Sequence, residues 1–176
     1  DKAAMQRLEQ DARQDQNPVA QTALAWALVI SKCKFSTGNQ KEATALYKSS
    51  ADAGYPVAMS AYAIRLVIGL GTSAQPELAP EYIKRAMNGG YSKAGIFYAR
   101  ELIVGKKLPR DLNEAAKWLK RAERDGVDKK LLAKELKHLR DTEKKLSLAS
   151  NSVTVKPALS AEASTTSGST VDIAGI

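Results

Sequence analysis

Few residues in this chain are of the types that carry out chemistry. His138 is the only histidine and Cys33 the only cysteine, so the chain can form neither an internal disulfide nor a thiolate-based metal site, and His138 has no partner of either kind. Glu77 and Glu81 lie close in sequence, as the two acids of a glycoside hydrolase would. The pair is better explained by the favourable interaction of acidic side chains with the positive end of the helix dipole near a helix start. Asp111 precedes the run NEAAKW and is typical of an N-cap. We therefore expect no catalytic, cofactor-binding or metal-binding residue.

The elements around these residues recur at a fixed interval. Gly54, Gly90 and Gly126 are 36 residues apart. Three other sets keep the same spacing: Ala43, Ala79 and Ala115; Tyr47, Ile83 and Leu119; Lys48, Lys84 and Lys120. A period of this size is typical of stacked helical repeats.

Each period predicts two helices. An apolar set at i, i+4, i+5 and i+8 predicts the first helix, because this spacing places all four residues on one face. The sets are Ala20, Leu24, Ala25 and Leu28; Ala58, Tyr62, Ala63 and Leu66; and Ala94, Tyr98, Ala99 and Leu102. The glycines predict the end of the second helix, because glycine readily adopts positive φ.

The period also predicts how the chain is divided. The predicted boundaries are residues 1–16 for an N-terminal half-repeat or capping helix, 17–54, 55–90 and 91–126 for three repeats, 127–148 for a C-terminal capping helix, and 149–176 for a flexible Ser/Thr-rich tail. The turn at 69–80 has two glycines and two prolines, so we expect it to be the loosest of the three.

The net charge of +8 is concentrated near the end of the chain. Residues 106–145 hold 14 Lys/Arg against 8 Asp/Glu. Interleaved acids make nucleic acid an unfavourable partner, since phosphate binding favours an uninterrupted basic face. Lys130, Lys134 and Lys137 remain possible contacts to a polyanion or to lipid headgroups, or simply part of a solvated face. No apolar run approaches the about 18 residues of a membrane span.

The third repeat resembles a known family. The resemblance rests on Ala94, Tyr98, Ala99, Leu102, Gly105, Leu108, Pro109, Asp111, Ala115, Trp118, Leu119, Ala122 and Gly126. In this pattern the chain is similar to the Sel-like repeats, α/α solenoids related to tetratricopeptide repeats. The resemblance implies an all-α, right-handed solenoid that serves as a binding platform. Many members are adaptors in bacterial envelopes.

The positions left over by the core predict a binding surface. They form three rows: Ala23, Ala61 and Phe97; Trp26, Ile64 and Arg100; and Ala27, Arg65 and Glu101. The middle row is a mixed apolar and cationic strip of the kind that anchors a protein segment. Alternatively, Trp26 and Ile64 pack against neighbouring helices. The predicted partner contacts are Trp26, Ile64, Arg65, Phe97 and Arg100.

The resemblance, together with the absence of a catalytic set of residues, implies a non-enzymatic adaptor that binds protein partners. It also implies a periplasmic location or association with a bacterial envelope complex for export, motility or signalling. The alternatives are a regulatory or immunity protein that inhibits one enzyme or receptor, an enzyme acting on cell-wall glycans through Glu77 and Glu81, and a cytoplasmic location.

Overall fold

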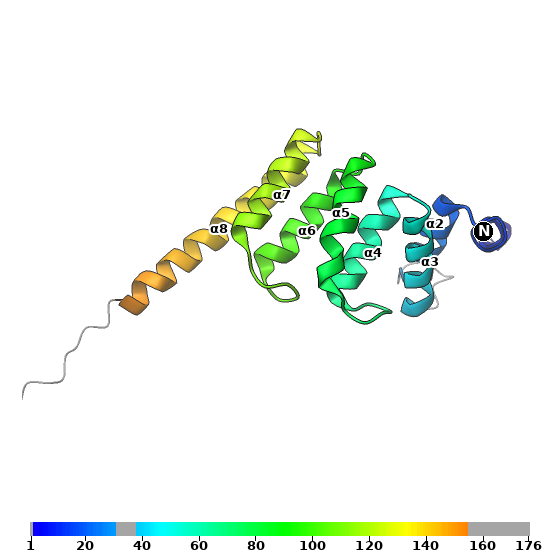
Figure 1. Ribbon diagram of the computed structural model, residues 1–176, viewed down its shortest axis with the longest axis horizontal. Helices are drawn as coiled ribbons and strands as arrows, with labels where there is room; N and C mark the ends of the chain where they lie inside the picture. Colours follow the sequence, from blue (N-terminus) through cyan, green and yellow to red (C-terminus); the bar gives the residue numbers. More distant parts are fainter. Residues whose placement is uncertain (1, 31–37, 155–176) are drawn as a thin grey trace, which may run out of the picture. The chain divides into compact units, whose positions relative to one another are not determined.

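The computed structural model describes residues 2–30 and 38–154 (Figure 1). Within these ranges the backbone forms α-helices and one short 3₁₀ helix, without a strand. The chain divides into two units, Asp1–Glu143 and Lys144–Ile176. The described part of the second unit is the end of one helix, where the Ser147 hydroxyl donates to the Lys144 carbonyl. No helix within the described ranges is both long enough and apolar enough to cross a membrane.

The helices agree with the predicted repeats in number and order. They are α1 (Lys2–Arg13), α2 (Pro18–Val29), α3 (Gln40–Asp52), α4 (Pro56–Ile68), the 3₁₀ helix η1 (Pro76–Leu78), α5 (Ala79–Asn88), α6 (Lys93–Val104), α7 (Leu112–Arg124) and α8 (Lys129–Thr154). We refer to α2, α4 and α6 as the A helices and to α3, α5 and α7 as the B helices.

Local sequence signals place the helix ends. The Asn17 side chain accepts hydrogen bonds from the first backbone amides of α2, with Pro18 in its first turn. The Asp111 side chain caps α7 by accepting from the Glu114 amide at 2.8 Å, as predicted. The glycines that follow the B helices all have positive φ: Gly54 at 95°, Gly90 at 92° and Gly126 at 77°.

The predicted core positions are buried in every repeat. None of the twelve predicted core residues of the A helices is more than 8% exposed, and the equivalent alanines of the B helices, Ala43, Ala79 and Ala115, are fully buried. In two of the three repeats, aromatic rings of the A and B helices meet at equivalent positions. Tyr62 meets Tyr82 edge-on at 5.0 Å between centroids, and Tyr98 meets Trp118 at 5.5 Å.

The helices form an all-α solenoid, as predicted. Each A helix contacts the next A helix and the B helix that follows it in sequence, so A and B helices make two layers within the first unit. Figure 1 shows α2 to α7 side by side in chain order. One face of the A layer is therefore left without a covering layer of helices in this part of the chain.

The turn between α4 and α5 is held against α3. Whether it is the loosest of the three turns stays a prediction, because most of the turn between α2 and α3 lies outside the described residues. The Leu70 carbonyl accepts hydrogen bonds from the Thr44 hydroxyl at 2.7 Å and from the Arg65 guanidinium at 3.4 Å. A Cβ atom at Gly71, where φ is 72°, would lie 2.1 Å from the Gln40 carbonyl oxygen. Glycine at this position therefore lets the turn lie directly on α3.

One helix end differs from the predicted bounds, and one predicted residue lies outside the described part of the chain. α2 ends at Val29, and Cys33 lies outside the described residues. α8 continues to Thr154, past residue 148 where we expected the capping helix to end and the tail to begin. The rest of the predicted tail, 155–176, also lies outside the described residues.

Candidate functional site

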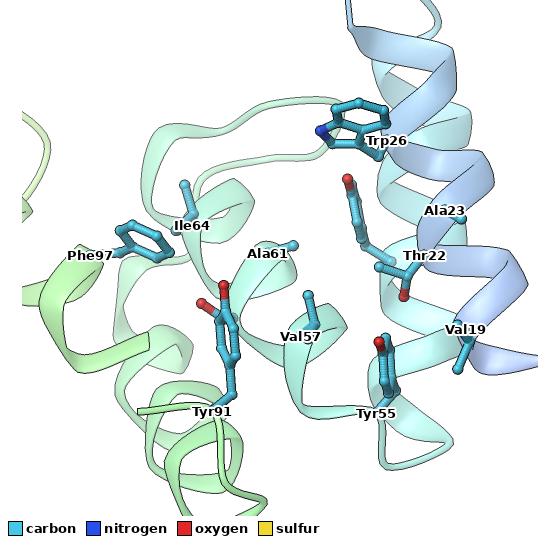
Figure 2. Close-up of a pocket in the computed structure, with 12 residues that line it drawn as sticks. Val19, Thr22, Ala23, Trp26, Tyr55, Val57, Ala61, Ile64, Tyr91 and Phe97 are labelled. Atoms are coloured by element: carbon cyan, nitrogen blue, oxygen red, sulfur yellow. The ribbon is translucent and has the colours of Figure 1, made fainter. Parts of the chain in front are cut away.

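A groove lies on the A layer of the first unit. Its volume is about 420 Å³, and it is lined by Val19, Thr22, Ala23, Trp26, Tyr47, Tyr55, Val57, Ser60, Ala61, Ile64, Tyr91 and Phe97. Five of these side chains are aromatic, so we call it the aromatic groove. Figure 2 shows Trp26 from α2, Ile64 from α4 and Phe97 from α6 around the same space.

The repeat explains why these residues meet. α2 contributes Val19, Thr22, Ala23 and Trp26, and α4 contributes the equivalent Val57, Ser60, Ala61 and Ile64. The spacing i, i+3, i+4 and i+7 places each set on one helix face. Because α2 and α4 lie next to each other, the two faces form one continuous apolar wall.

The wall is open to solvent. The side chains of Trp26 and Val19 are 58% and 55% exposed, among the most exposed large apolar residues that the structure describes. The alternative in which Trp26 packs against a neighbouring helix is therefore wrong. Clustered exposed apolar residues of this kind typically mark interaction surfaces.

Tyrosines border the groove at equivalent positions of two repeats. Tyr55 is the N-cap residue of α4, and Tyr91 stands 36 residues later, just before α6. Figure 2 shows their rings on either side of Val57, with the hydroxyls pointing the same way. Burial raises the pKa of the Tyr91 hydroxyl, and nearby Tyr55 raises it further. The Tyr91 phenol therefore stays protonated at neutral pH and can donate a hydrogen bond.

Two small hydroxyl residues complete the lining, and they differ in their partners. The Thr22 hydroxyl lies 2.8 Å from the Ser50 hydroxyl, which donates to the Pro18 carbonyl. Ser60 is only 2% exposed, and its hydroxyl has no hydrogen-bond partner among the described residues. A buried hydroxyl without a partner costs about 1–3 kcal/mol. Ser60 is therefore an unused polar group in the groove wall.

Arg65, one of the predicted partner contacts, is buried instead of lining the groove. Its side chain is 6% exposed, and its guanidinium donates to the Gln40 and Thr44 side chains at 3.0 and 2.9 Å. The guanidinium carbon lies 4.9 Å from the centroid of the Tyr47 ring, whose side chain lines the groove. Burial lowers the pKa of Arg65, partly offset by Tyr47. Arg65 thus places a positive charge behind the groove wall.

The expectation that the third leftover row faces the groove or solvent is wrong for two of its members. Ala27 and Arg65 are both buried, at 7% and 6% exposed. The physical reason is that each A helix packs against its own B helix and against the neighbouring repeat. The buried arc of the helix is therefore wider than the four core positions used to define it.

Arg100, the third residue of the predicted row Trp26, Ile64 and Arg100, pairs with a residue of α8. Its guanidinium forms an ion pair with Glu135, with Nε 3.0 Å from Oε1, and lies 6.0 Å from the centroid of the Phe97 ring. Hydrogen bonding to Glu135 raises the pKa of Arg100. Glu135 is only 1% exposed. Arg100 therefore neutralises a buried carboxylate and does not line the groove.

The other candidates from the sequence lie apart from the groove lining. Glu77 and Glu81 are exposed, in η1 and in the first turn of α5. His138 Nδ1 lies 3.5 Å from Glu135 Oε2. Among the described residues, no three His, Cys, Asp or Glu side chains are grouped as metal ligands. Lys130, Lys134 and Lys137 are exposed on one face of α8. Their contact with a polyanion or lipid headgroups stays a prediction.

Sequence reasoning identified Trp26, Ile64 and Phe97, which the groove brings together, and missed the tyrosines. Tyr55 and Tyr91 carry a signal, since both occupy the first position of a repeat. Tyr47 belongs to the predicted apolar row of the B helices, and its second role at the groove depends on how α3 and α4 pack.

Comparison of the sequence with known protein families gives no match, and comparison with curated proteins gives none either. Solved structures do resemble the chain. A Sel1 repeat protein from Oxalobacter formigenes superimposes with a TM-score of 0.51 and 23% identity, over 63% of this chain and 44% of that chain. A protective antigen of uropathogenic Escherichia coli, which displays an SLR fold, superimposes with a TM-score of 0.57 and 18% identity. The match covers 70% of this chain and 26% of that chain. This chain spans less than half of either protein, and it has the Sel-like repeat fold.

Proposed function

We propose that this chain is a non-enzymatic adaptor that holds a segment of a partner protein in the aromatic groove. The observation that carries the proposal is the exposure of Trp26, at 58%, in a wall of apolar and aromatic side chains. Tryptophan and tyrosine are the residues that most often dominate binding energy at protein interfaces. Repeat solenoids use such extended faces for binding.

The openness of the groove favours a protein segment over a small molecule. Small-molecule pockets bury about 70–90% of their ligand. Here Val19 and Trp26 remain more than half exposed at the rim. Apart from Tyr47 of α3, the lining residues come from three successive A helices and the turns before them, so the site is elongated along the repeats. A linear segment fits such a surface better than a compact ligand does.

We also propose that the complex belongs to a bacterial envelope. Support comes from the resemblance to Sel-like repeats, many of which are envelope adaptors, and from the E. coli protein of this fold, which is a protective antigen. Fractionation of the native cells tests the location. Recovery of the chain with periplasmic or membrane-associated proteins is expected, and recovery with the cytoplasmic fraction alone would refute this part.

Site-specific photocrosslinking tests the binding role. A photoreactive phenylalanine analogue placed at Trp26 should crosslink a partner in the native cells. The same analogue at Leu78 is the matched control, because Leu78 is a 44% exposed apolar residue outside the groove lining. Crosslinks at position 26 and not at 78 would support the proposal. Equal yields, or no adduct at 26, would refute it.

The stoichiometry of the crosslinked complex separates the adaptor from the inhibitor. An adaptor should bridge two different proteins, so removal of the chain should separate them. If the chain is an inhibitor, the complex should contain one partner in a one-to-one ratio with the chain, and the activity of that partner should be reduced.

A further inference from the structure

The aromatic groove combines an exposed ring with a hollow on the same surface. Figure 2 shows the Trp26 ring on one side of the groove and the side chains of Val57 and Tyr91 on the opposite side. The short side chain of Ala61 lies between them. Trp26 is 58% exposed. The groove volume of about 420 Å³ lies within the range that holds drug-sized ligands, so there is room for an indole ring.

A surface with both parts is complementary to a second copy of itself. In a two-fold symmetric dimer the same patch of each copy meets the other, so residue i contacts residue j and residue j contacts residue i. Consider two chains placed groove to groove, with the two-fold axis across the middle of the wall. The Trp26 ring of each copy then lies against Val57 and Tyr91 of the other. One surface therefore supplies both halves of two identical contacts.

The polar groups of the groove also suit an identical surface. None of the residues that line the groove carries a charge. Two copies can therefore meet there without bringing like charges together, which is strongly unfavourable at an interface. The Tyr55 and Tyr91 hydroxyls can each donate and accept a hydrogen bond, so they can pair with the same groups of a second copy. Carboxylates or ammonium groups would lack this property.

The charges of the A helices do not favour a strongly acidic or basic partner. α2 contains no charged residue, and Arg65, the one charged residue of α4, is buried. On α6, Lys93 and Glu101 carry opposite charges, and Arg100 is paired with Glu135. An apolar surface without a charge preference is what contact with a second copy requires.

We infer that a second copy of this chain covers the aromatic groove, in a two-fold symmetric dimer in which the Trp26 ring of each copy packs into the groove of the other. Homodimer interfaces are more apolar than other protein interfaces, in keeping with this wall. A partner segment that binds the groove then displaces the second copy, so self-association controls access to the site. That control rests on the proposed binding role of the groove, whereas the dimer itself does not.

Sedimentation velocity of the purified chain tests the dimer. The contact uses one face of three A helices, so we expect a weak complex, with a dissociation constant on the order of 10 µM. Trp26→Ser should raise this constant at least about tenfold, because a tryptophan often dominates binding at an interface. Leu78→Ser is the matched control, since Leu78 is 44% exposed and lies outside the groove lining. A chain that stays monomeric at about 200 µM, or an equal effect of both substitutions, would overturn the inference.

The salt dependence distinguishes an apolar contact from an electrostatic one. The net charge of +8 is concentrated in residues 106–145, outside the groove lining. Two copies with this charge repel each other at a distance, and salt screens the repulsion. We therefore expect the dimer to become about twofold tighter or more between about 50 and about 500 mM NaCl. A dimer that weakens as salt is added would be held by opposite charges, which would overturn the inference.

Ala23→Glu tests the middle of the wall and leaves Trp26 in place. Ala23 is exposed in the single chain, so the fold should tolerate glutamate there, with an unchanged melting temperature in dilute solution. In the dimer the new carboxylate would be covered without a cation among the lining residues. We expect the dissociation constant to rise at least about tenfold. Dimerisation as tight as that of the unmodified chain would overturn the inference.

Photocrosslinking separates the dimer from the binding role. With the photoreactive analogue at position 26, the purified chain should give a covalent dimer of twice the chain mass. If it gives none, but native cells give an adduct with another protein, the inference fails and the binding role stands. If native cells give only the covalent dimer, the inference stands and the binding role fails. A monomeric chain that binds phospholipid vesicles through Trp26 would assign the groove to a membrane surface and overturn the inference.

Discussion

Trp26, Ile64 and Arg100 occupy the same position of three successive repeats, yet they have different surroundings. Trp26 and Ile64 line the open groove of α2 and α4. Arg100 of α6 pairs with Glu135 of α8. A repeated position therefore stays available for binding only where no neighbouring element supplies a partner for it. In the first two repeats the face is open, whereas near the capping helix it is used for stability.

The same contrast appears between adjacent residues of α4. Ile64 lines the groove, while the next residue, Arg65, is buried and holds the turn against α3 through Leu70. Both belonged to the predicted binding surface. The substitutions below separate the binding residues from the structural ones by their effects on stability.

The largest effect is expected for Arg100→Ala, which leaves the buried Glu135 without its ion-pair partner. Losing one member of a buried pair costs about 3–5 kcal/mol, and partial exposure of Arg100 reduces this to about 2–3 kcal/mol. Urea denaturation measures the change. Arg100→Met combined with Glu135→Leu should recover most of the loss. If the double variant is as unstable as Arg100→Ala, the buried charge is not the cause.

A somewhat smaller loss is expected for Arg65→Met. The methionine fills a similar volume but loses the hydrogen bonds to Gln40, Thr44 and Leu70, so we expect unfolding to become easier by about 1–2 kcal/mol. Hydrogen exchange at the turn between α4 and α5 should also increase. Ile64→Ala is the control for an adjacent groove residue, and protection of this turn should be unchanged in it. Equal exchange in both variants would contradict the structural role of Arg65.

Ser60→Ala should have a small effect of the opposite sign. Removing an unpartnered buried hydroxyl is expected to stabilise the fold by up to about 1 kcal/mol. Thr22→Val, at the equivalent position of the first repeat, is the comparison, because the Thr22 hydroxyl is bonded to Ser50. Its loss should destabilise the fold by about 1 kcal/mol. Thermal denaturation measures both changes. A destabilised Ser60→Ala variant together with a stabilised Thr22→Val variant would contradict the hydrogen bonding described for the two hydroxyls.

The smallest change in stability is expected for Trp26→Phe, within about 0.5 kcal/mol, because surface substitutions have little effect. The readout is fluorescence, since Trp118 is then the only tryptophan left. Trp118 is half-buried and packs against Tyr98. The remaining emission should shift to shorter wavelength and be quenched less by acrylamide. An unchanged spectrum would mean that Trp26 is not exposed as described.

Sequence patterns predicted the fold well because its determinants are local and periodic. The core positions of the A helices, the glycines that follow the B helices, and the Asn17 and Asp111 caps each depend on residues within a few turns of one another. The period strengthens the prediction, because the same residue pattern occurs in each repeat. For the groove, subtraction of the core from the repeat correctly brought Trp26, Ile64 and Phe97 together.

The sequence by itself determined the helical repeat and the faces that each helix buries. The tertiary structure alone decided the roles of Arg65 and Arg100, because their partners come from other elements: Gln40 and Thr44 of α3, and Glu135 of α8. It also decided that Tyr47, Tyr55 and Tyr91 border the same groove as Trp26. Helix periodicity specifies which way a side chain points from its own axis. What it meets there depends on how separate helices are placed, which no local spacing encodes.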